Sequence, residues 1–385
     1  MVADLPQAAA SRTRVLVACS TLHIGGAEGV VACLAEHVNR ARFEVTACYL
    51  KENGVVGESM LEQGVDLVPV PGHVRGRRDR FTSLKLLRLI RQRNIQVVHT
   101  HDVHGLMDAT ICRRLLPALR HVHTFHFGNY PHRDRASARF ERICWRSPDA
   151  LVAVGHAQAD AIRSLYGVDP SRLRVIWNGV PDPASGRSTA MREDVAEWSR
   201  PTILSISTLI QQKGLPHLLD AAKILKDDGL SFRLVIAGHG DMRHSLERRV
   251  ADLGLAGDVT FLGWIPDAAR RVLPDCDVFV QSSLWEAMSI VVLEAMAAAR
   301  PVVVTRVGEN AHAVEDGVSG LLVPPGDPRA LARALARLLL DPAAAARLGQ
   351  SARNRYLAHF TLRPMVAAYE SLYSELARNT VPAHA

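Results

Sequence analysis

The chain has 385 residues, 48% of them hydrophobic and 22% charged, with a formal net charge of +7. This length exceeds the roughly 100–200 residues of a single domain, so we expect two domains with large cores. The composition excludes a fibrous or disordered chain, and no apolar run approaches the roughly 18 residues of a membrane helix. The N-terminus has neither a basic leader nor an apolar block, which predicts a cytoplasmic protein.

The positive net charge favours an anionic partner, which can be nucleic acid, a lipid head group or a phosphate-bearing small molecule. No nucleic-acid motif or aromatic interleaving accompanies the charge, so we do not expect nucleic acid as a partner. The six cysteines lack the paired spacing of a zinc site or a redox dithiol, and we expect them to be reduced and buried. They are Cys19, Cys33, Cys48, Cys112, Cys144 and Cys276.

Short β-branched runs alternate with longer helical patterns, as in parallel sheets built from strand–helix–strand units. The first predicted strands are Val15–Cys19, Val45–Leu50, Asp66–Val70, Val97–Thr100, Val122–Phe125, Leu151–Val154 and Val175–Trp177. Residues 178–188 are rich in Pro, Gly and Ser and indicate an interdomain linker. The strands predicted after it are Thr202–Ser207, Arg233–Ala237, Val259–Leu262, Val278–Val280, Val302–Thr305 and Leu321–Val323.

This pattern predicts an α/β fold of two doubly wound, Rossmann-like domains. We place the N-terminal domain at residues 1–182 and the C-terminal domain at 183–360, followed by a helical stretch at 361–385 that can pack back on the first domain. Residues 328–348, rich in Ala, Leu and Arg, have apolar positions at helical spacing and are predicted as a surface helix. Ligands bind at the carboxyl ends of parallel strands, so function should concentrate in a cleft between the facing domains.

Gly25 and Gly26 follow the first predicted strand and open a helix. Two glycines there let the backbone approach a phosphate closely, and the start of a helix favours negative charge. A purely structural turn explains the pair equally well. The pair does not complete the dinucleotide fingerprint, which requires three spaced glycines and an acidic residue about 20 positions further on.

The densest basic stretch spans residues 73–93. Its second half interleaves basic residues with leucines and reads as an amphipathic helix. A solvated surface and an anionic membrane surface are both consistent with this pattern. The basic residues are Arg75, Arg77, Arg78, Arg80, Lys85, Arg88, Arg91 and Arg93.

Histidines gather at two neighbouring predicted strands: His99, His101, His104, His121, His123 and His126. Residues two apart on a strand share a face, so a metal site is conceivable. No further ligand or carboxylate accompanies the histidines, and we expect no metal. One or two of them should line the cleft as hydrogen-bonding groups, and the others should be packed.

In the second half, Lys213 follows the first predicted strand, where an ammonium group can hold a departing diphosphate. Gly238 ends the next strand and suits a turn on which a base or ribose can rest, although a structural turn is an equal alternative. Asp275 and Asp277 resemble a metal-binding pair, but they lead directly into a strand. We therefore expect them to serve capping and turn chemistry.

The most informative feature is a pair of glutamates, Glu286 and Glu294, where a loop passes into a predicted helix. Free amides at the start of this helix attract anions, which places Ser289 and Ile290 beside a phosphate. Two carboxylates roughly two turns apart on one helix edge can each accept hydrogen bonds from sugar hydroxyls. The pair therefore predicts a nucleotide-sugar site.

Taken together these residues resemble the retaining glycosyltransferases of family 4, which have the GT-B fold of two facing Rossmann-like domains. The resemblance covers essentially the whole chain and is most specific over residues 286–327. It implies that Glu286 binds hydroxyls of the donor sugar and that Glu294 binds the ribose of the nucleotide.

The donor-side loops depart from the family pattern at several positions. Thr208 stands where the family usually has a phosphate-binding arginine, whereas the phosphate-binding lysine remains as Lys213. Met288 and Ser289 replace a Phe-Gly pair, so the resemblance implies a differently shaped loop whose amides still meet the phosphate. One phosphate contact is therefore missing.

On the acceptor side, Gly25, Gly26 and Glu28 match the family's Gly-Gly-Ala-Glu loop. His126 closes a Thr-Phe-His motif that resembles the family's acceptor-side histidine, and we place His101 beside it. The resemblance implies a hydroxyl-bearing acceptor, with glycolipid, cell-envelope or exopolysaccharide synthesis as the context.

The implied reaction moves a glycosyl group from a nucleoside diphosphate to a hydroxyl with retention, without a metal or cofactor. Lys213, Glu286 and His126 are the candidate catalytic residues, and no carboxylate is placed as a covalent nucleophile. A sugar-nucleotide 2-epimerase on the same architecture and a non-catalytic nucleotide-sugar-binding partner are the alternatives.

Overall fold

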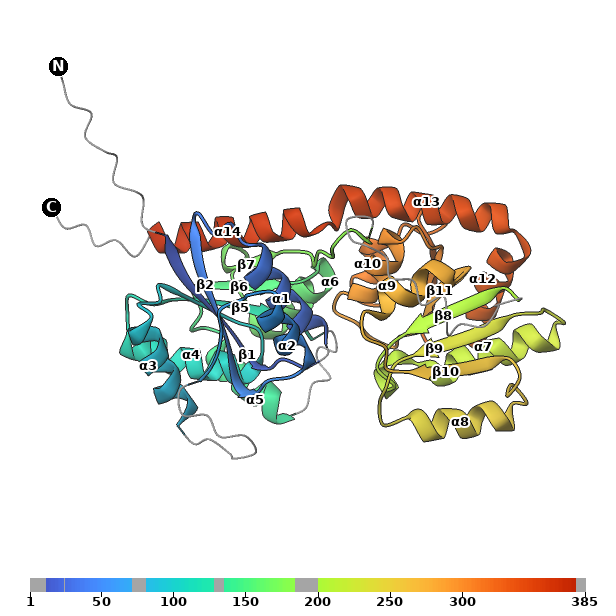
Figure 1. Cartoon of the computed structure of the whole chain (residues 1–385), viewed down its shortest axis with the longest axis horizontal. Helices are drawn as coiled ribbons and strands as arrows, with labels where there is room; N and C mark the ends of the chain where they lie inside the picture. Colours follow the sequence, from blue (N-terminus) through green and yellow to red (C-terminus); the bar gives the residue numbers. More distant parts are fainter. Residues whose placement is uncertain (1–11, 24, 71–80, 128–134, 184–199, 379–385) are drawn as a thin grey trace, which may run out of the picture.

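The structure is a computed structural model that describes residues 12–23, 25–70, 81–127, 135–183 and 200–378. Two α/β halves lie side by side, each built on its own parallel sheet (Figure 1). The basic residues expected at 75–80 lie outside the described residues. The described part confirms the predicted GT-B architecture of two facing doubly wound domains.

The first sheet has seven described strands in the order β3-β2-β1-β4-β5-β6-β7, and every pair is parallel. The strands are β1 (Thr13–Thr21), β2 (Phe43–Glu52), β3 (Leu67–Pro69), β4 (Val97–Thr100), β5 (Arg120–Phe125), β6 (Ala150–Ala153) and β7 (Leu173–Val175). Their apolar runs are buried on both faces because helices cover both sides of the sheet.

Alternate residues of β1 enter different cores. Val15 and Val17 pack with α1 (Gly26–His37), α2 (Val55–Glu62) and α14 (Leu362–Arg378). Leu16 packs with α3 (Thr82–Gln92) and α4 (Val103–Leu115) on the opposite face. The helices that follow β3 to β6 are α3 (Thr82–Gln92), α4 (Val103–Leu115), α5 (Arg135–Cys144) and α6 (His156–Tyr166).

The second sheet has six described strands in the order β10-β9-β8-β11-β12-β13. The strands are β8 (Thr202–Ile206), β9 (Arg233–Ala237), β10 (Val259–Gly263), β11 (Val278–Gln281), β12 (Val302–Thr305) and β13 (Leu321–Val323). The helices are α7 (Leu215–Asp227), α8 (Arg243–Asp252), α9 (Ala268–Val272), α10 (Ile290–Ala297), α11 (Asn310–Ala313), α12 (Pro328–Leu340) and α13 (Pro342–His359). Short 3-10 turns are η1 (Pro170–Arg172), η3 (Gln211–Lys213) and η4 (Leu273–Asp275).

Each predicted strand is present, with ends shifted by a few residues, and the largest correction concerns the helix predicted over 328–348. Two helices, α12 and α13, occupy this region. Asp341 separates them because its side chain accepts a hydrogen bond from Ala344 N at 2.8 Å and so caps α13. Pro342 then fits the first position of the new helix.

The chain crosses between the halves twice. Val180, on the first crossing, pairs with Thr361, on the second. Helix α13 lies over the second sheet, and α14 returns over the first, where Tyr369 and Tyr373 are fully buried (Figure 1, red). The C-terminal helix is therefore part of the first core.

None of the helices in the described ranges combines the length and the apolarity needed to cross a membrane. All six cysteines are free thiols, and five are buried; Cys33 is only partly buried, which corrects the expectation for that residue.

Candidate active site

Glu286 lies in the loop between β11 and α10, four residues before the helix begins, and only 7% of it is exposed. Glu294 lies within α10. The expectation that both carboxylates line one helix edge is therefore wrong, because the loop that carries Glu286 turns before the helix starts. The two carboxylates approach the site from different elements.

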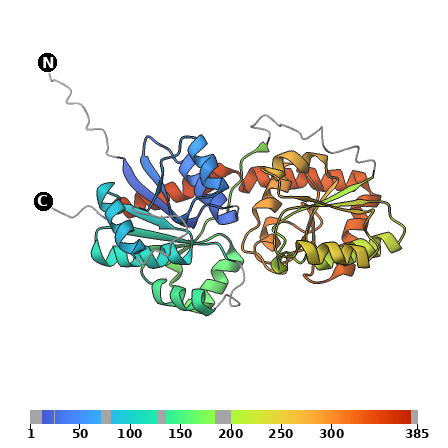
Figure 2. The same cartoon turned by 60° about the horizontal axis from the view of Figure 1, so that its bottom comes forward.

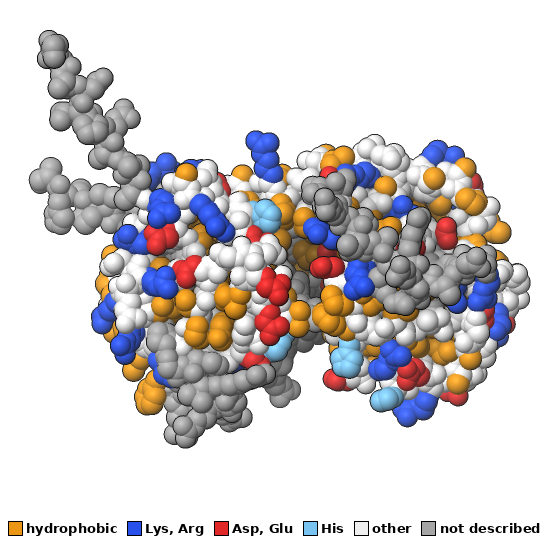
Figure 3. All heavy atoms as spheres, viewed as in Figure 1, with side chains coloured by type: hydrophobic (Ala, Val, Ile, Leu, Met, Phe, Trp, Pro, Cys, Tyr) orange, Lys and Arg blue, Asp and Glu red, His pale blue; other side chains and the backbone are white. Residues whose placement is uncertain are grey.

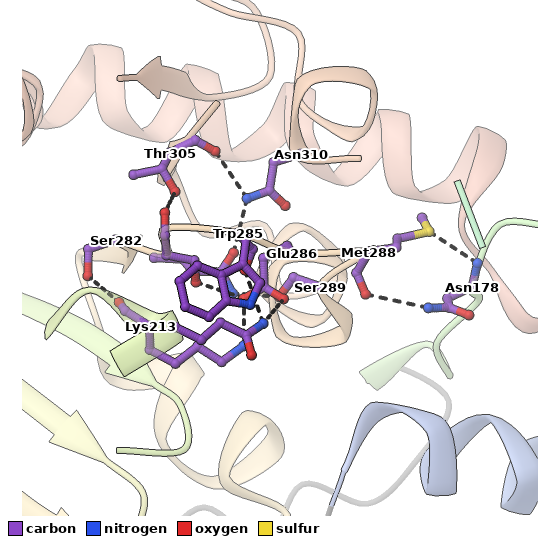
Figure 4. Close-up of polar contacts among 12 residues, drawn as sticks. Asn178, Lys213, Ser282, Trp285, Glu286, Met288, Ser289, Thr305 and Asn310 are labelled. Carbon is purple, nitrogen blue, oxygen red and sulfur yellow. Dashed lines mark hydrogen bonds and ion pairs between the residues drawn. The ribbon is translucent and has the colours of Figure 1, made fainter. Parts of the chain in front are cut away.

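The Glu286 carboxylate is held by three side chains (Figure 4). Lys213 Nζ lies 2.5 Å from Oε1, and Ser283 Oγ donates to the same oxygen at 2.7 Å. Gln212 Nε2 donates to Oε2 at 3.3 Å. Lys213, which is expected to bind a diphosphate, thus forms an ion pair with Glu286, which is expected to bind the sugar. We call this pair the Lys213–Glu286 unit.

Close backbone approaches fix the loops that carry this unit. Gly214 has φ +59°, and a Cβ placed there would lie 2.2 Å from the carbonyl oxygen of Ser282. Gly308 has φ +49°, and its Cβ would lie 2.1 Å from the carbonyl oxygen of Glu286. Only glycine fits both positions, which lets three loops from different strand ends meet.

The first turn of α10 keeps its backbone amides uncapped. Ser289 is the N-cap residue, but its hydroxyl accepts a hydrogen bond from Gln281 Nε2 at 2.6 Å and makes no capping bond. Asn310 Nδ2 donates to the Gln281 side-chain oxygen at 3.1 Å and so orients that amide. The positive end of α10, beginning at Ile290, is therefore available to an anion.

The glycine loop of the first domain faces this helix start across the cleft. Gly25 is the N-cap of α1 and offers no capping side chain. A Cβ placed on Gly26 would lie 3.6 Å from Ile290 Cγ1. Figure 3 shows the surface hollowed between the two halves. Two helix starts thus converge, and both favour negative charge. The Glu28 carboxylate already lies at the start of α1, since a Cβ on Gly25 would be 2.2 Å from its Oε2.

Asn178 joins the halves at the same place. Its backbone N–H donates to Met288 Sδ at 3.2 Å, and its side-chain amide donates to the Met288 carbonyl oxygen at 3.5 Å (Figure 4). Met288, expected to contact the donor, is buried and makes an interdomain contact. The expected phosphate contact concerns the backbone amides of this loop, and it stays a prediction.

Burial raises the pKa of Glu294 to about 7, with a further increase from the Asp267 carboxylate that Arg270 opposes. Near neutral pH this carboxyl group is therefore partly protonated, and it can both donate and accept hydrogen bonds. Such a group suits a vicinal pair of hydroxyls.

Thr208 is exposed in the loop after β8. Gly238 has φ +148°, and a Cβ there would lie 1.9 Å from the carbonyl oxygen of Ser207. A pocket of about 530 Å³ opens beside the Lys213 loop, with Gln211, Gly214, Asp241 and Leu284 among its lining residues. Asp241 in its lining follows the turn at Gly238, where a base is expected to bind.

The histidines divide into packed and cleft-side groups. His99 lies 2.6 Å from Tyr373 Oη and 2.8 Å from Thr124 Oγ1. His121 and His123 both approach Thr100 Oγ1 at 2.9 Å from the opposite face of the sheet. These three are packed, as the strand pattern predicts.

His101 Nδ1 lies 2.9 Å from His126 Nε2, and the two rings stack. His101 is only 1% exposed, so it supports His126 from behind and does not itself line the cleft. Burial lowers the pKa of His126 to about 4, opposed by Asp102, and keeps the ring neutral at pH 7. Burial also raises the pKa of Glu28 at the start of α1.

Within the described ranges, no three His, Cys, Asp or Glu side chains are grouped so that they could hold a metal ion. Asp277 accepts a hydrogen bond from Thr202 N at 2.7 Å, and Asp275 lies in η4. Asp275 therefore lies in a turn as expected, whereas Asp277 contacts the start of β8, which corrects the expectation of a turn contact for that residue.

The buried histidines predict acid lability. Burial lowers the pKa of His99, His101, His121 and His126 below the unfolded value of about 6.5. The unfolded state binds more protons below pH 6.5, so the free energy of unfolding should fall as pH drops from about 6.5 toward 4. Each histidine should contribute about 1.4 kcal/mol per pH unit.

Urea unfolding between pH 7.5 and 5 measures this slope. His121→Gln keeps a partner for Thr100 but removes a titrating group, and it should make the pH dependence shallower. His244→Gln, at an exposed position of α8, should leave it unchanged. An equal slope in His121→Gln and the parent protein would contradict the assignment.

Sequence reasoning missed Glu309, which is fully buried between the halves. Trp177 Nε1 donates to its Oε1 at 2.7 Å, and Ala157 N donates to its Oε2 at 3.1 Å. The backbone of Gly155 allows this approach, since a Cβ there would lie 2.4 Å from Oε2. The glutamate of the second domain thus binds the start of α6 in the first. Gln212 and Ser283 were also missed, and no periodicity marks any of the three.

Two facing Rossmann-like domains, with a lysine–carboxylate unit and the open start of α10 at their cleft, define the GT-B class of fold. The family model "Glycosyl transferases group 1" matches residues 188–355, and "Glycosyltransferase Family 4" matches residues 24–182. The chain belongs to this glycosyltransferase family.

Named relatives agree with the family. The lipopolysaccharide core biosynthesis glycosyltransferase LpsE of Rhizobium meliloti is 33% identical over 308 residues, covering 79% of this chain and 85% of the relative. Alpha-maltose-1-phosphate synthase of Mycobacterium tuberculosis is 32% identical over 298 residues, covering 69% and 75%. The structure of HepE from Anabaena with UDP and glucose has a TM-score of 0.83 at 18% identity, covering 94% of this chain and 100% of HepE.

Proposed function

We propose that the chain transfers a sugar from a nucleoside diphosphate to an acceptor hydroxyl with retention of configuration. The observation that carries this proposal is the Lys213–Glu286 unit beside the open start of α10. Glu286 accepts hydrogen bonds from donor-sugar hydroxyls, and Lys213 lies close enough to turn toward the diphosphate. Glu294 takes the ribose, and Thr208 and Gly238 lie on the nucleotide side.

In the proposed reaction the acceptor oxygen bonds to the anomeric carbon as the bond from that carbon to the diphosphate breaks. The acceptor proton passes to a phosphate oxygen, and the proposed reaction uses no metal or cofactor. Charge growing on the diphosphate is stabilised by Lys213 and by amides at Gly25, Gly26 and Ile290. Neutral His126 accepts a hydrogen bond on the acceptor side, to which Glu28 is also assigned. Closure of the domains excludes water.

The relative named for lipopolysaccharide core synthesis supports a cell-envelope acceptor, and the UDP and glucose bound to HepE make UDP-sugars the first donors to test. Glycolipid and exopolysaccharide synthesis belong to the same proposal. The cytoplasmic location expected from the sequence stays a prediction.

A donor panel tests the proposal directly. The purified chain is incubated with UDP- and GDP-sugars and with lipid or saccharide acceptors, and NMR of the product gives the anomeric configuration. Retention supports the proposal, and an inverted product contradicts it. A new nucleotide sugar formed without acceptor would instead show the epimerase, and tight donor binding without turnover would show a non-catalytic partner.

A further inference from the structure

Three neighbouring helices on the outer side of the first sheet carry a dense group of exposed apolar side chains. Helix α4 packs between α3 and α5, and Figure 2 shows all three along one side of the sheet. In the described residues, six of the fourteen exposed large hydrophobic side chains lie on these helices or directly before α3. They are Phe81 (63% exposed), Leu84 (54%), Ile111 (45%), Leu115 (51%), Phe140 (43%) and Ile143 (67%).

The exposed side chains form stripes along the helices. On α3, Leu84 and Arg88 are four residues apart on the solvent side, while Leu86, Leu87, Leu89 and Ile90 are buried against the sheet. On α4, Ile111 and Leu115 have the same spacing. The apolar and basic side chains therefore point away from the core together.

The charge on this surface has one sign. Its exposed basic residues are Arg88, Arg91, Arg114, Arg139 and Arg142. The two described carboxylates of the three helices are both hydrogen-bonded within the protein. Asp108 accepts a hydrogen bond from Ser83 Oγ at 2.5 Å. Glu141 is only 1% exposed and accepts a hydrogen bond from Tyr166 Oη at 2.7 Å. Among the described side chains of α3, α4 and α5, no carboxylate is therefore exposed to oppose the arginines.

We propose that this surface, made by α3, α4 and α5, docks on an anionic lipid bilayer. Separate apolar side chains can enter the boundary between head groups and acyl chains, while the arginines meet anionic head groups. Helix α4 begins after its N-cap residue Asp102, which directly follows His101, and His101 contacts His126 on the proposed acceptor side. The purpose of docking rests on the proposed function, because a lipid-borne acceptor would then reach the cleft from the bilayer.

Vesicle flotation of the full chain tests the proposal. Phosphatidylglycerol-containing vesicles should carry the protein, phosphatidylcholine vesicles should carry far less, and 0.5 M salt should release it. The double variant Leu84→Glu/Ile143→Glu should lose at least about tenfold in bound fraction. Leu340→Glu, a change at a 74% exposed position of α12 on the second domain, should bind as the parent does.

Circular dichroism and melting temperature show whether each variant is folded. No flotation with anionic vesicles, or equal flotation of the α3/α5 double variant and the Leu340 variant, would overturn the proposal. Sugar transfer to a water-soluble acceptor is measured separately, so loss of lipid binding and failure of the proposed reaction give different results.

Discussion

Replacing Glu286 by Ala should lower kcat/KM for sugar transfer by about 10²–10³-fold. The variant loses an acceptor for donor-sugar hydroxyls, and it also leaves Lys213 without the carboxylate that lies 2.5 Å from its ammonium group. Because the two residues form one unit, Lys213→Ala should have a loss of similar size, and the double variant should lose less than the product of the two single effects. Steady-state kinetics with a saturating acceptor measures this coupling.

Matched surface variants provide the control. Lys223→Ala on α7 and Glu247→Ala on α8 remove the same charges from partly exposed positions outside the proposed site and should retain transfer activity. Wild-type turnover in folded Glu286→Ala and Lys213→Ala proteins would remove the assignment of this unit to the active site.

Replacing Glu309 by Ala should destabilise the protein and loosen the contact between its halves. The change leaves the partly buried indole N–H of Trp177 and amide of Ala157 without their acceptor. A fully buried unpaired donor costs about 1–3 kcal/mol; water reaches these two in part, and the desolvation of the lost carboxylate offsets part of the cost, so we expect about 1–3 kcal/mol in total. Melting temperature and small-angle X-ray scattering measure the two effects.

Glu309→Gln separates packing from hydrogen bonding. The amide keeps one acceptor oxygen, so this variant should retain part of the stability that Glu309→Ala loses. Glu315→Ala, at an exposed position beyond α11, is the surface control. If the Glu309→Ala variant has the melting temperature and the X-ray scattering profile of the parent protein, Glu309 does not hold the halves together.

The fold was readable from the sequence because strands buried on both faces appear as short apolar runs separated by helical patterns. The break between α12 and α13 was not, since Asp341 and Pro342 lie inside an otherwise continuous helical pattern. The return of α14 to the first domain is decided by packing of Tyr369 and Tyr373 in a core formed by distant residues.

The site was readable only in part. Its residues Lys213, Glu286 and Glu294 stand out by type and position, but the ion pair between residues 73 apart depends on loop geometry that glycines at 214 and 308 permit. In the sequence, Glu309 looks like an ordinary polar loop residue. Only the packing of the two domains shows that it contacts Trp177 and Ala157 of the first domain. The basic pattern of α3 was likewise visible in the sequence. The exposed apolar and basic surface extends over α4 and α5 only because these helices pack beside α3.

The bridge between Val180 and Thr361 sets how the two halves can move. Both connecting segments run through one spot, where Tyr356 Oη also donates to the Val180 carbonyl oxygen at 2.9 Å. Because the two connecting segments are held side by side, we expect the halves to rotate about one common hinge axis. The same arrangement opposes sliding of one half past the other. We therefore expect the cleft to open for ligand exchange while the site residues of the two domains keep their alignment along the hinge axis.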